Sequence, residues 1–236
     1  AFPAVSVPAI LLAQIAATEQ LAELGLDLNH VHFSGHSQGV LGAVAMDPAG
    51  DDEAAVKALA FAFILGAAAT NDYGATDARS RMLSVRGLTV DQINEFVPED
   101  SGAVLSVINE RRHVVLSSTP EALAQAQSAI ESQASDYNAR LEVEFGGSEI
   151  QPTFDYLDVA YPFHVTSNMA AVEQAAQWAE ACGITFAGTT PRELAQTILV
   201  DTFDFTTTVR DLLREGASHV LSLDKGTTTL VSALVS

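Results

Sequence analysis

The spacing of hydrophobic residues predicts alternating helices and strands in the first third of the chain. Apolar residues recur at helical spacing over residues 8–24 and again over residues 53–69. Between them, residues 30–34 form a short apolar run typical of a strand, and residues 38–46 continue as an apolar helix. Strand–helix alternation of this kind predicts a parallel sheet with helices on its faces.

The pattern changes near residue 80. We expect strands at 82–85, 104–109, 113–117 and 140–145, with helices at 89–96 and 119–133. This order, strand-helix-strand-strand-helix-strand, is typical of a ferredoxin-like split βαβ unit. Helices are expected again at 166–182, 191–198 and 205–215, with short strands at 184–186 and 219–223. We therefore predict an α/β core of residues 1–79 and 151–236, into which a ferredoxin-like subdomain of residues 80–150 is inserted.

A Gly-x-Ser-x-Gly motif follows the first predicted strand, at Gly35-His36-Ser37-Gln38-Gly39. A sharp strand-to-helix turn exposes the serine hydroxyl, and its strained backbone needs glycine on both sides of Ser37. The amide of Gln38, at the start of the following helix, points toward an oxyanion formed beside Ser37. The motif predicts a nucleophile, the alternative being a serine that only caps the helix.

His164 is the best candidate for the base that activates Ser37. It follows Tyr161-Pro162-Phe163 and opens a helix, and catalytic groups concentrate at such loop–helix junctions. An imidazole with a near-neutral pKa takes the serine proton and returns it to a leaving thiol. We expect His36 to shape the pocket and His113 to be a surface residue of its strand. The remaining histidines are expected to have structural roles: His30, His32 and His219.

Composition excludes several classes of protein. The net charge of −19 argues against a nucleic-acid partner, because phosphates are neutralised by clustered Lys and Arg. The single cysteine, Cys182, permits no internal disulfide, and no metal-ligand spacing is present, so no metal is expected. The longest apolar run, Ala58 to Ala69, is too short to cross a membrane. We expect a cytoplasmic protein without a membrane segment, and, because the sequence opens without Met, an excerpt of a longer chain.

The serine motif, taken together with Pro162-Phe163-His164, resembles the acyltransferase domains of type I fatty acid synthases, in the malonyl-CoA:carrier-protein transacylase superfamily. The resemblance continues, in the same order, through residues 81–88, 105–109, 114–117 and 205–209. It implies a hydrolase-like, parallel-sheet α/β core that carries a ferredoxin-like insert.

The resemblance also implies roles for individual residues. Ser37 would be the nucleophile and His164 the base of a Ser-His dyad, with the imidazole oriented by a backbone carbonyl near residues 198–202. Gln38 would supply an oxyanion amide. Asn109 matches a position that lines the cleft between the subdomains, and the substrate-binding set would be Leu65, Asn109, Phe163 and His36.

Two departures from the family pattern affect the expected substrate. Members that carry malonyl groups place an arginine in the long helix after the serine, and Leu65 most closely matches that place here. Gln38 and Val40 replace the usual Leu and Glu of the malonyl-type motif. Both differences indicate an uncharged acyl group. The family's Gly-Gln-Gly segment, which supplies the other oxyanion amide, is not in this sequence, so we expect the first strand of the domain to be missing.

We therefore predict acetyl or short-acyl transfer from coenzyme A to the phosphopantetheine of an acyl carrier protein, through an acyl-serine, as starter loading in a bacterial type I fatty acid synthase. No bound cofactor is implied. The expected partners are acyl-CoA, a carrier-protein domain and the other domains of a homo-oligomeric synthase. Four arginines are candidates for binding coenzyme A phosphates or are solvated surface charges: Arg79, Arg81, Arg111 and Arg112.

Three alternatives remain open at this point. The chain is a malonyl or palmitoyl transferase domain of the same kind of synthase, or a serine esterase, or a catalytically silent docking module. In the esterase, Asp155 or Asp158 would complete a triad with Ser37 and a histidine.

Overall fold

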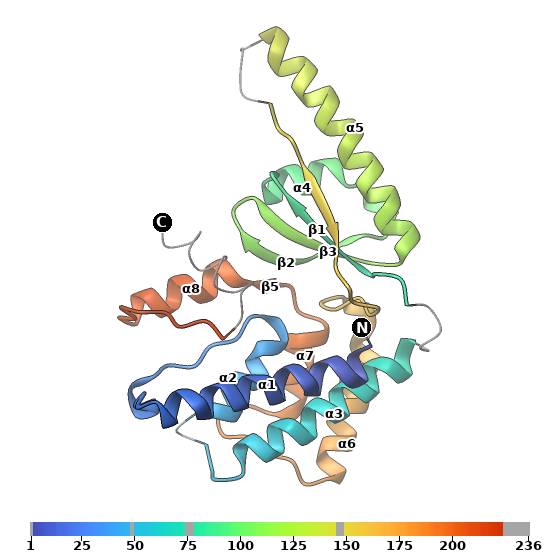
Figure 1. Ribbon diagram of the computed structural model, residues 1–236. Coiled ribbons are helices and arrows are strands. Elements are labelled where there is room, and N and C mark those ends of the chain that lie inside the picture. Colours follow the sequence, from blue (N-terminus) through green and yellow to red (C-terminus); the bar gives the residue numbers. More distant parts are fainter. Residues whose placement is uncertain (1, 48–49, 74–77, 145–148, 224–236) are drawn as a thin grey trace.

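The computed structural model describes residues 2–47, 50–73, 78–144 and 149–223. Its elements form a helical body and a sheet-containing part that lies above it in Figure 1. The helical body consists of α1 (Pro3–Glu23), α2 (Val40–Met46), α3 (Ala54–Tyr73), α6 (Met169–Ala181), α7 (Pro191–Leu199) and α8 (Phe205–Arg214). Short 3-10 turns add η1 (Leu28–His30), η2 (Ser37–Gly39), η3 (Glu99–Ser101) and η4 (Thr166–Asn168).

The sheet has five strands in the order β4-β1-β3-β2-β5. They are β1 (Met82–Arg86), β2 (Val104–Glu110), β3 (His113–Ser117), β4 (Thr153–Tyr156) and β5 (Phe203–Asp204). Strands β1, β2, β3 and β4 pair antiparallel, and with α4 (Val90–Phe96) and α5 (Pro120–Glu144) they follow the predicted split βαβ order. The last strand, β5, pairs parallel with β2 and joins the sheet to the helical body.

The two faces of this sheet face different cores. Because side chains alternate along a strand, Leu83 and Val85 point toward α4 and α5 and join the core on that side. Val107 and Val115 belong instead to the core of the helical body. Polar residues of β1 and β3, including Ser84 and His113, lie on this second face. Residues 82–85 of β1 and all of β3 are therefore buried, with Ser84 and His113 facing the helical body, while the edge strand β4 is mostly exposed.

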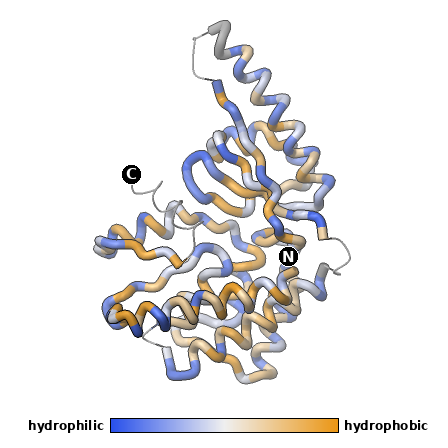
Figure 2. The backbone as a smooth tube through the Cα atoms, viewed as in Figure 1, coloured by the Kyte–Doolittle hydropathy of each residue, from blue (hydrophilic) through white to orange (hydrophobic). Residues whose placement is uncertain are grey.

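Helices α1 and α3 pack closely against each other. A Cβ at Gly66 would lie 2.5 Å from the carbonyl oxygen of Pro3, so glycine permits this approach. The amide of Ala4 donates a 3.2 Å hydrogen bond to Thr70 Oγ1 across the same contact. Figure 2 shows that hydrophobic residues predominate along both helices.

By length and composition alone, α1 and α3 are each long and apolar enough to cross a membrane. The prediction that no apolar segment is long enough to cross a membrane is therefore wrong for these two helices. Buried core helices reach the same length and hydropathy, so these two properties alone do not indicate a membrane segment. Helix α3 places Phe61 and Leu65, both fully buried, in the core of the helical body.

One predicted strand is replaced by helix. Residues 140–144 continue α5, because no glycine or proline follows Pro120 within the helix and Ala, Arg, Leu and Glu favour helix. Residue 145 lies outside the described residues. The fourth strand of the split unit is β4 instead, beyond the predicted limit at residue 150. The boundaries of the two parts otherwise stay a prediction.

The strands expected for a parallel core are not formed within the described residues. The backbone is extended at Val31 (φ −106°, ψ 128°), yet residues 31–35 pair with no other strand there. Residues 184–186 and 219–223 are likewise unpaired in the described part of the chain. A strand is stabilised by hydrogen bonds to a neighbour, so these segments are loops. Within the same residues, the parallel pairing is that of β5 with β2.

Candidate active site

Ser37 stands at the start of η2 in a left-handed conformation, with φ +53°. This conformation is unfavourable for a residue with a side chain, and it is the kind of strain expected of a nucleophile turn. A Cβ at Gly35 would overlap the backbone of Gly39 and Val40, so only glycine fits there. At Gly39 a Cβ would meet Gln14 Nε2 at an ordinary 3.8 Å. The need for glycine predicted on both sides of the serine therefore holds at position 35 and not at position 39.

The structure brings Ser37 and His164 into direct contact. Ser37 Oγ lies 2.7 Å from His164 Nε2, and His164 Nδ1 lies 2.7 Å from the backbone carbonyl oxygen of Asp201. A carbonyl only accepts, so Nδ1 carries the proton and Nε2 is left as the acceptor for the serine hydroxyl. The orienting carbonyl falls within residues 198–202, the range that the family resemblance implied.

His164 is buried and electrically neutral. Its residue is 1% exposed, and burial lowers the pKa of the imidazole to about 4, outweighing the hydrogen bond to the Asp201 carbonyl, which raises it. At neutral pH the ring therefore has a free lone pair on Nε2. The donor position of His164 is taken by a backbone carbonyl, so neither Asp155 nor Asp158 is the carboxylate that orients this ring.

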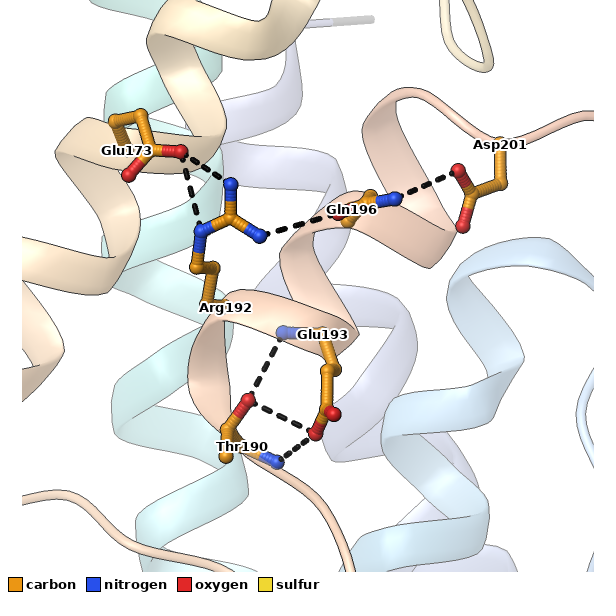
Figure 3. Close-up of polar contacts among 6 residues, drawn as sticks. All are labelled: Glu173, Thr190, Arg192, Glu193, Gln196 and Asp201. Carbon is orange, nitrogen blue, oxygen red and sulfur yellow. Dashed lines mark hydrogen bonds and ion pairs between the residues drawn. The ribbon is translucent and has the colours of Figure 1, made fainter.

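A network of side chains holds the segment that presents the Asp201 carbonyl (Figure 3). Gln196 Nε2 donates to Asp201 Oδ1 at 3.2 Å, and the Gln196 carbonyl accepts from the amide of Asp201 at 3.0 Å. Arg192 Nη1 donates to Gln196 Oε1 at 3.3 Å and pairs through Nη2 with Glu173 Oε1 at 2.6 Å. Thr190 and Glu193 form a capping box that starts α7. The turn after α7 is thus fixed from the side chains of α6 and α7.

A groove of about 460 Å³ lies between α6 and α7 and is lined in part by Glu173, Glu180 and Arg192. Neither Ser37 nor His164 lines it. It is therefore separate from the serine site. Among the described residues, no group of three or more His, Cys, Asp and Glu side chains is placed to hold a metal ion.

A second polar network lies beside the serine turn. His36 Nε2 donates to Asn109 Oδ1 at 2.7 Å, and Asn109 Nδ2 donates to His113 Nε2 at 3.3 Å. Ser84 Oγ lies 2.9 Å from the same His113 nitrogen. The His36 ring also packs against Phe203 and Phe205, with centroids 5.1 and 4.9 Å apart. The network ties the serine turn to β1, β2 and β3 across the junction of the two parts.

The prediction that His113 is a surface residue is wrong. His113 is 5% exposed, and burial, followed by the charges of Arg86 and His36, lowers its pKa to about 4. The sequence held a signal for this position. His113 is two residues from Val115 in the same strand, and the shared face packs on the helical body.

The other predicted site residues lie on several different elements. Gln38 follows Ser37 in η2, and the buried Phe163 precedes His164 and packs edge-on against Tyr161. Leu65 is buried in the core on α3, which packs against α2. Arg79 pairs with Glu121 at 2.6 Å, while Arg111 and Arg112 are exposed in the β2–β3 turn. The catalytic and binding roles of all these residues stay predictions.

Comparison with known proteins supports the resemblance. Residues 81–156 match the family model "Fatty acid synthase central AT domain". The chain is 26% identical over 159 residues to the fatty acid synthase beta subunit TOXC of Cochliobolus carbonum, covering 56% of this chain and 8% of that subunit. The resemblance to an acyltransferase domain is therefore confirmed, while the bacterial origin stays a prediction.

Solved structures confirm the fold. The acyltransferase domain of an iterative polyketide synthase of enediyne biosynthesis is 25% identical, with a TM-score of 0.68, covering 100% of this chain and 58% of that one. A malonyl-transacylase in complex with its type II polyketide synthase acyl-carrier protein is 19% identical, with a TM-score of 0.75, covering 99% of this chain and 75% of that one. The chain has the acyltransferase fold, and it spans a small part of its fungal relative.

The serine turn gives a first prediction. Gly35→Ala should destabilise the fold by about 3 kcal/mol or more, because the added methyl group meets backbone atoms that cannot move aside. Gly39→Ala, the matched control, should change stability by less than about 1 kcal/mol, since its new contact is ordinary. Urea unfolding measures both. Equal effects of the two substitutions would contradict the geometry of the turn.

The buried histidines give a second prediction. Burial lowers the pKa of His113 and of His164 to about 4 in the folded chain, below the ordinary imidazole value of 6.5, so the unfolded chain binds more protons between these limits. Stability should be complete above pH 6.5 and fall as the pH decreases toward 4. From pH 7 to pH 5 each histidine should remove about 2 kcal/mol from the free energy of unfolding.

The measurement compares unfolding midpoints of variants at pH 7 and pH 5. His113→Gln should lose about 2 kcal/mol less than the parent over this interval. His30→Gln, a control at a side chain that is 82% exposed, should follow the parent. A His113→Gln variant with the full pH dependence of the parent would show that this histidine is not buried in its neutral form.

Proposed function

We propose that this chain transfers an acyl group from a coenzyme A thioester to the phosphopantetheine thiol of an acyl carrier protein, through an acyl-serine. The observation that carries the proposal is the contact of Ser37 with His164, whose other nitrogen is held by the Asp201 carbonyl. This geometry activates a serine without a carboxylate partner. The match of residues 81–156 to the fatty acid synthase acyltransferase model supports the reaction class.

The first half-reaction uses one proton transfer in each direction. His164 Nε2 takes the proton of Ser37 as Oγ attacks the thioester carbonyl and forms a C–O bond. The amide of Gln38 stabilises the oxyanion. When the C–S bond breaks, the leaving coenzyme A thiolate takes up that proton from His164 Nε2. In the second half-reaction His164 Nε2 takes the proton of the carrier thiol as its sulfur attacks the acyl-serine carbonyl and forms a C–S bond. The C–O bond to Ser37 then breaks, and Ser37 Oγ takes the proton from His164, which regenerates the free serine.

The acyl group we propose is acetyl or another short, uncharged group. A free carboxylate in a buried site needs a cationic partner, and burial without one costs several kcal/mol. Helix α3 contains one basic residue, Lys57, which pairs with Asp51 and Glu53 at the start of the helix. Leu65, in the place proposed for the family's arginine, is apolar and buried.

Malonyl transfer is the second candidate, since the solved relative that was captured with its carrier protein is a malonyl-transacylase. That complex also supports an acyl carrier protein as the partner. The fungal relative is a subunit of a fatty acid synthase, which supports a place for this chain among other synthase domains. We propose that this synthase is a homo-oligomeric, cytoplasmic complex.

The amounts of acetyl-carrier and of free acetate formed distinguish the proposed transferase from a serine esterase and from a silent docking module. Mixed with acetyl-CoA and a phosphopantetheine-bearing carrier protein, the parent should form acetyl-carrier faster than free acetate. His164→Ala should slow acylation by about 10²–10⁴-fold, because the general base is lost. Mass spectrometry of the carrier and an acetate assay measure the partition. Release of acetate with no acetyl-carrier would support an esterase, and no turnover at all would support the docking module.

Substrate preference tests the acetyl assignment. Offered equal concentrations of acetyl-CoA and malonyl-CoA, the parent should be acylated with acetyl by at least about 10-fold over malonyl, because an unpaired carboxylate is rejected. Leu65→Arg should shift the ratio toward malonyl, with Leu65→Met as the uncharged control, after circular dichroism has shown both variants folded. A malonyl adduct on the parent would contradict the assignment. A folded Leu65→Arg variant with the ratio of the parent would remove Leu65 from the pocket.

A further inference from the structure

Asn168, the last residue of η4, is a buried polar residue that the proposed reaction does not yet use. It is 0% exposed, and its Nδ2 donates two hydrogen bonds to backbone carbonyls. One goes to Pro162 O at 2.7 Å and the other to Leu199 O at 2.8 Å. A single carboxamide NH₂ group therefore connects two segments that are far apart in the sequence.

Each of the two carbonyls lies two residues before one end of the hydrogen bond between His164 and Asp201. Pro162 is two residues before His164, and Leu199 is two residues before Asp201, whose carbonyl accepts from the His164 ring. The amide of Val165 adds a 3.0 Å hydrogen bond to the same Leu199 carbonyl. The segment that carries the base and the segment that carries its acceptor are thus joined beside the bond that orients the imidazole.

The orientation of the Asn168 amide follows from the chemistry of its partners. Both partners are carbonyl oxygens, so the NH₂ group must face them, because a flipped amide would place Oδ1 against two acceptors. Oδ1 is buried and has no hydrogen-bond partner among the described residues. A buried acceptor without a partner is unfavourable, so we infer that Asn168 contributes through its two donated bonds.

The backbone at His164 needs such support. Its φ is +61°, a left-handed conformation that costs a residue with a side chain on the order of 1–2 kcal/mol. A strained conformation persists only when the surrounding structure fixes it. The bonds from Asn168 and Val165 fix the backbone on both sides of His164.

We propose that Asn168 is a positioning residue for acyl transfer, whose NH₂ group clamps the His164 segment to the Asp201 segment so that Nε2 faces Ser37. The proposal rests on the proposed function for its kinetic part. It goes beyond the dyad because it assigns the orientation of the base to a side chain that touches neither substrate nor the reacting atoms.

Two variants test the clamp. Asn168→Leu keeps the size of the side chain and removes both donated bonds, and Asn168→Ser leaves a smaller side chain with a hydroxyl that donates at most one. We expect kcat for acylation to fall by about 10–100-fold in Asn168→Leu and by less in Asn168→Ser, with KM unchanged, because a small misplacement of a catalytic group costs this much. The control is Asn138→Leu, since Asn138 forms a comparable side-chain clamp with the backbone of Ile150, through bonds of 2.8 and 2.9 Å.

A second readout does not depend on catalysis. In ¹⁵N-labelled protein, the His164 ring of the parent and of Asn138→Leu should be the Nδ1–H tautomer with a proton that exchanges slowly with water. In the Asn168 variants this proton should exchange at least about 10-fold faster, because the bond to Asp201 is no longer held. If the parent is not acylated but the His164 ring proton still exchanges faster in the Asn168 variants than in the parent, the proposed function is refuted and the clamp is retained.

Three results would overturn the proposal. Folded Asn168 variants with the kcat and the imidazole exchange of the parent would show that the clamp does not position His164. An equal fall in kcat for Asn138→Leu would show a general effect of stability. Failure of both Asn168 variants to fold would assign the residue to structure alone.

Discussion

The site depends on one hydrogen bond, from His164 Nδ1–H to the carbonyl oxygen of Asp201. This bond fixes which ring nitrogen carries the proton, and it leaves the lone pair of Nε2 facing Ser37 Oγ at 2.7 Å. A backbone carbonyl brings no charge with it, so burial keeps the imidazole neutral at physiological pH. The position of Asp201 therefore matters more than its side chain, and Gln196 and Asn168 both act on the segment that presents it.

That segment leads directly into the junction between the helical body and the sheet. Two residues after Asp201, Phe203 begins β5 and pairs with Val107 of β2. Its ring lies 6.0 Å from that of His164 and 5.1 Å from that of His36. The hydrogen bond of His36 to Asn109 crosses the same junction. The two parts of the fold are thus joined beside Ser37 and His164, the residues that we propose carry out the chemistry.

Local chemistry was readable from the sequence where it depends on short segments. The serine turn, the Pro-Phe-His junction and the helix starts at Thr89 and Thr190 follow from residues within a few positions of each other. Features that depend on packing between segments far apart in the sequence could not be predicted from it. The burial of His113 and the two bonds of Asn168 require segments brought together by the fold. The strand expected at 140–145 failed for a local reason, since helix-forming residues there extend α5.

The most direct test of the central claim is the intact mass of the chain after brief mixing with acetyl-CoA, followed by peptide mapping. The arrangement of Ser37 against His164 predicts one acetyl group per chain, located on Ser37, and none on a Ser37→Ala variant. One acetyl group that persists at the same level in the folded Ser37→Ala variant would contradict the nucleophile assignment.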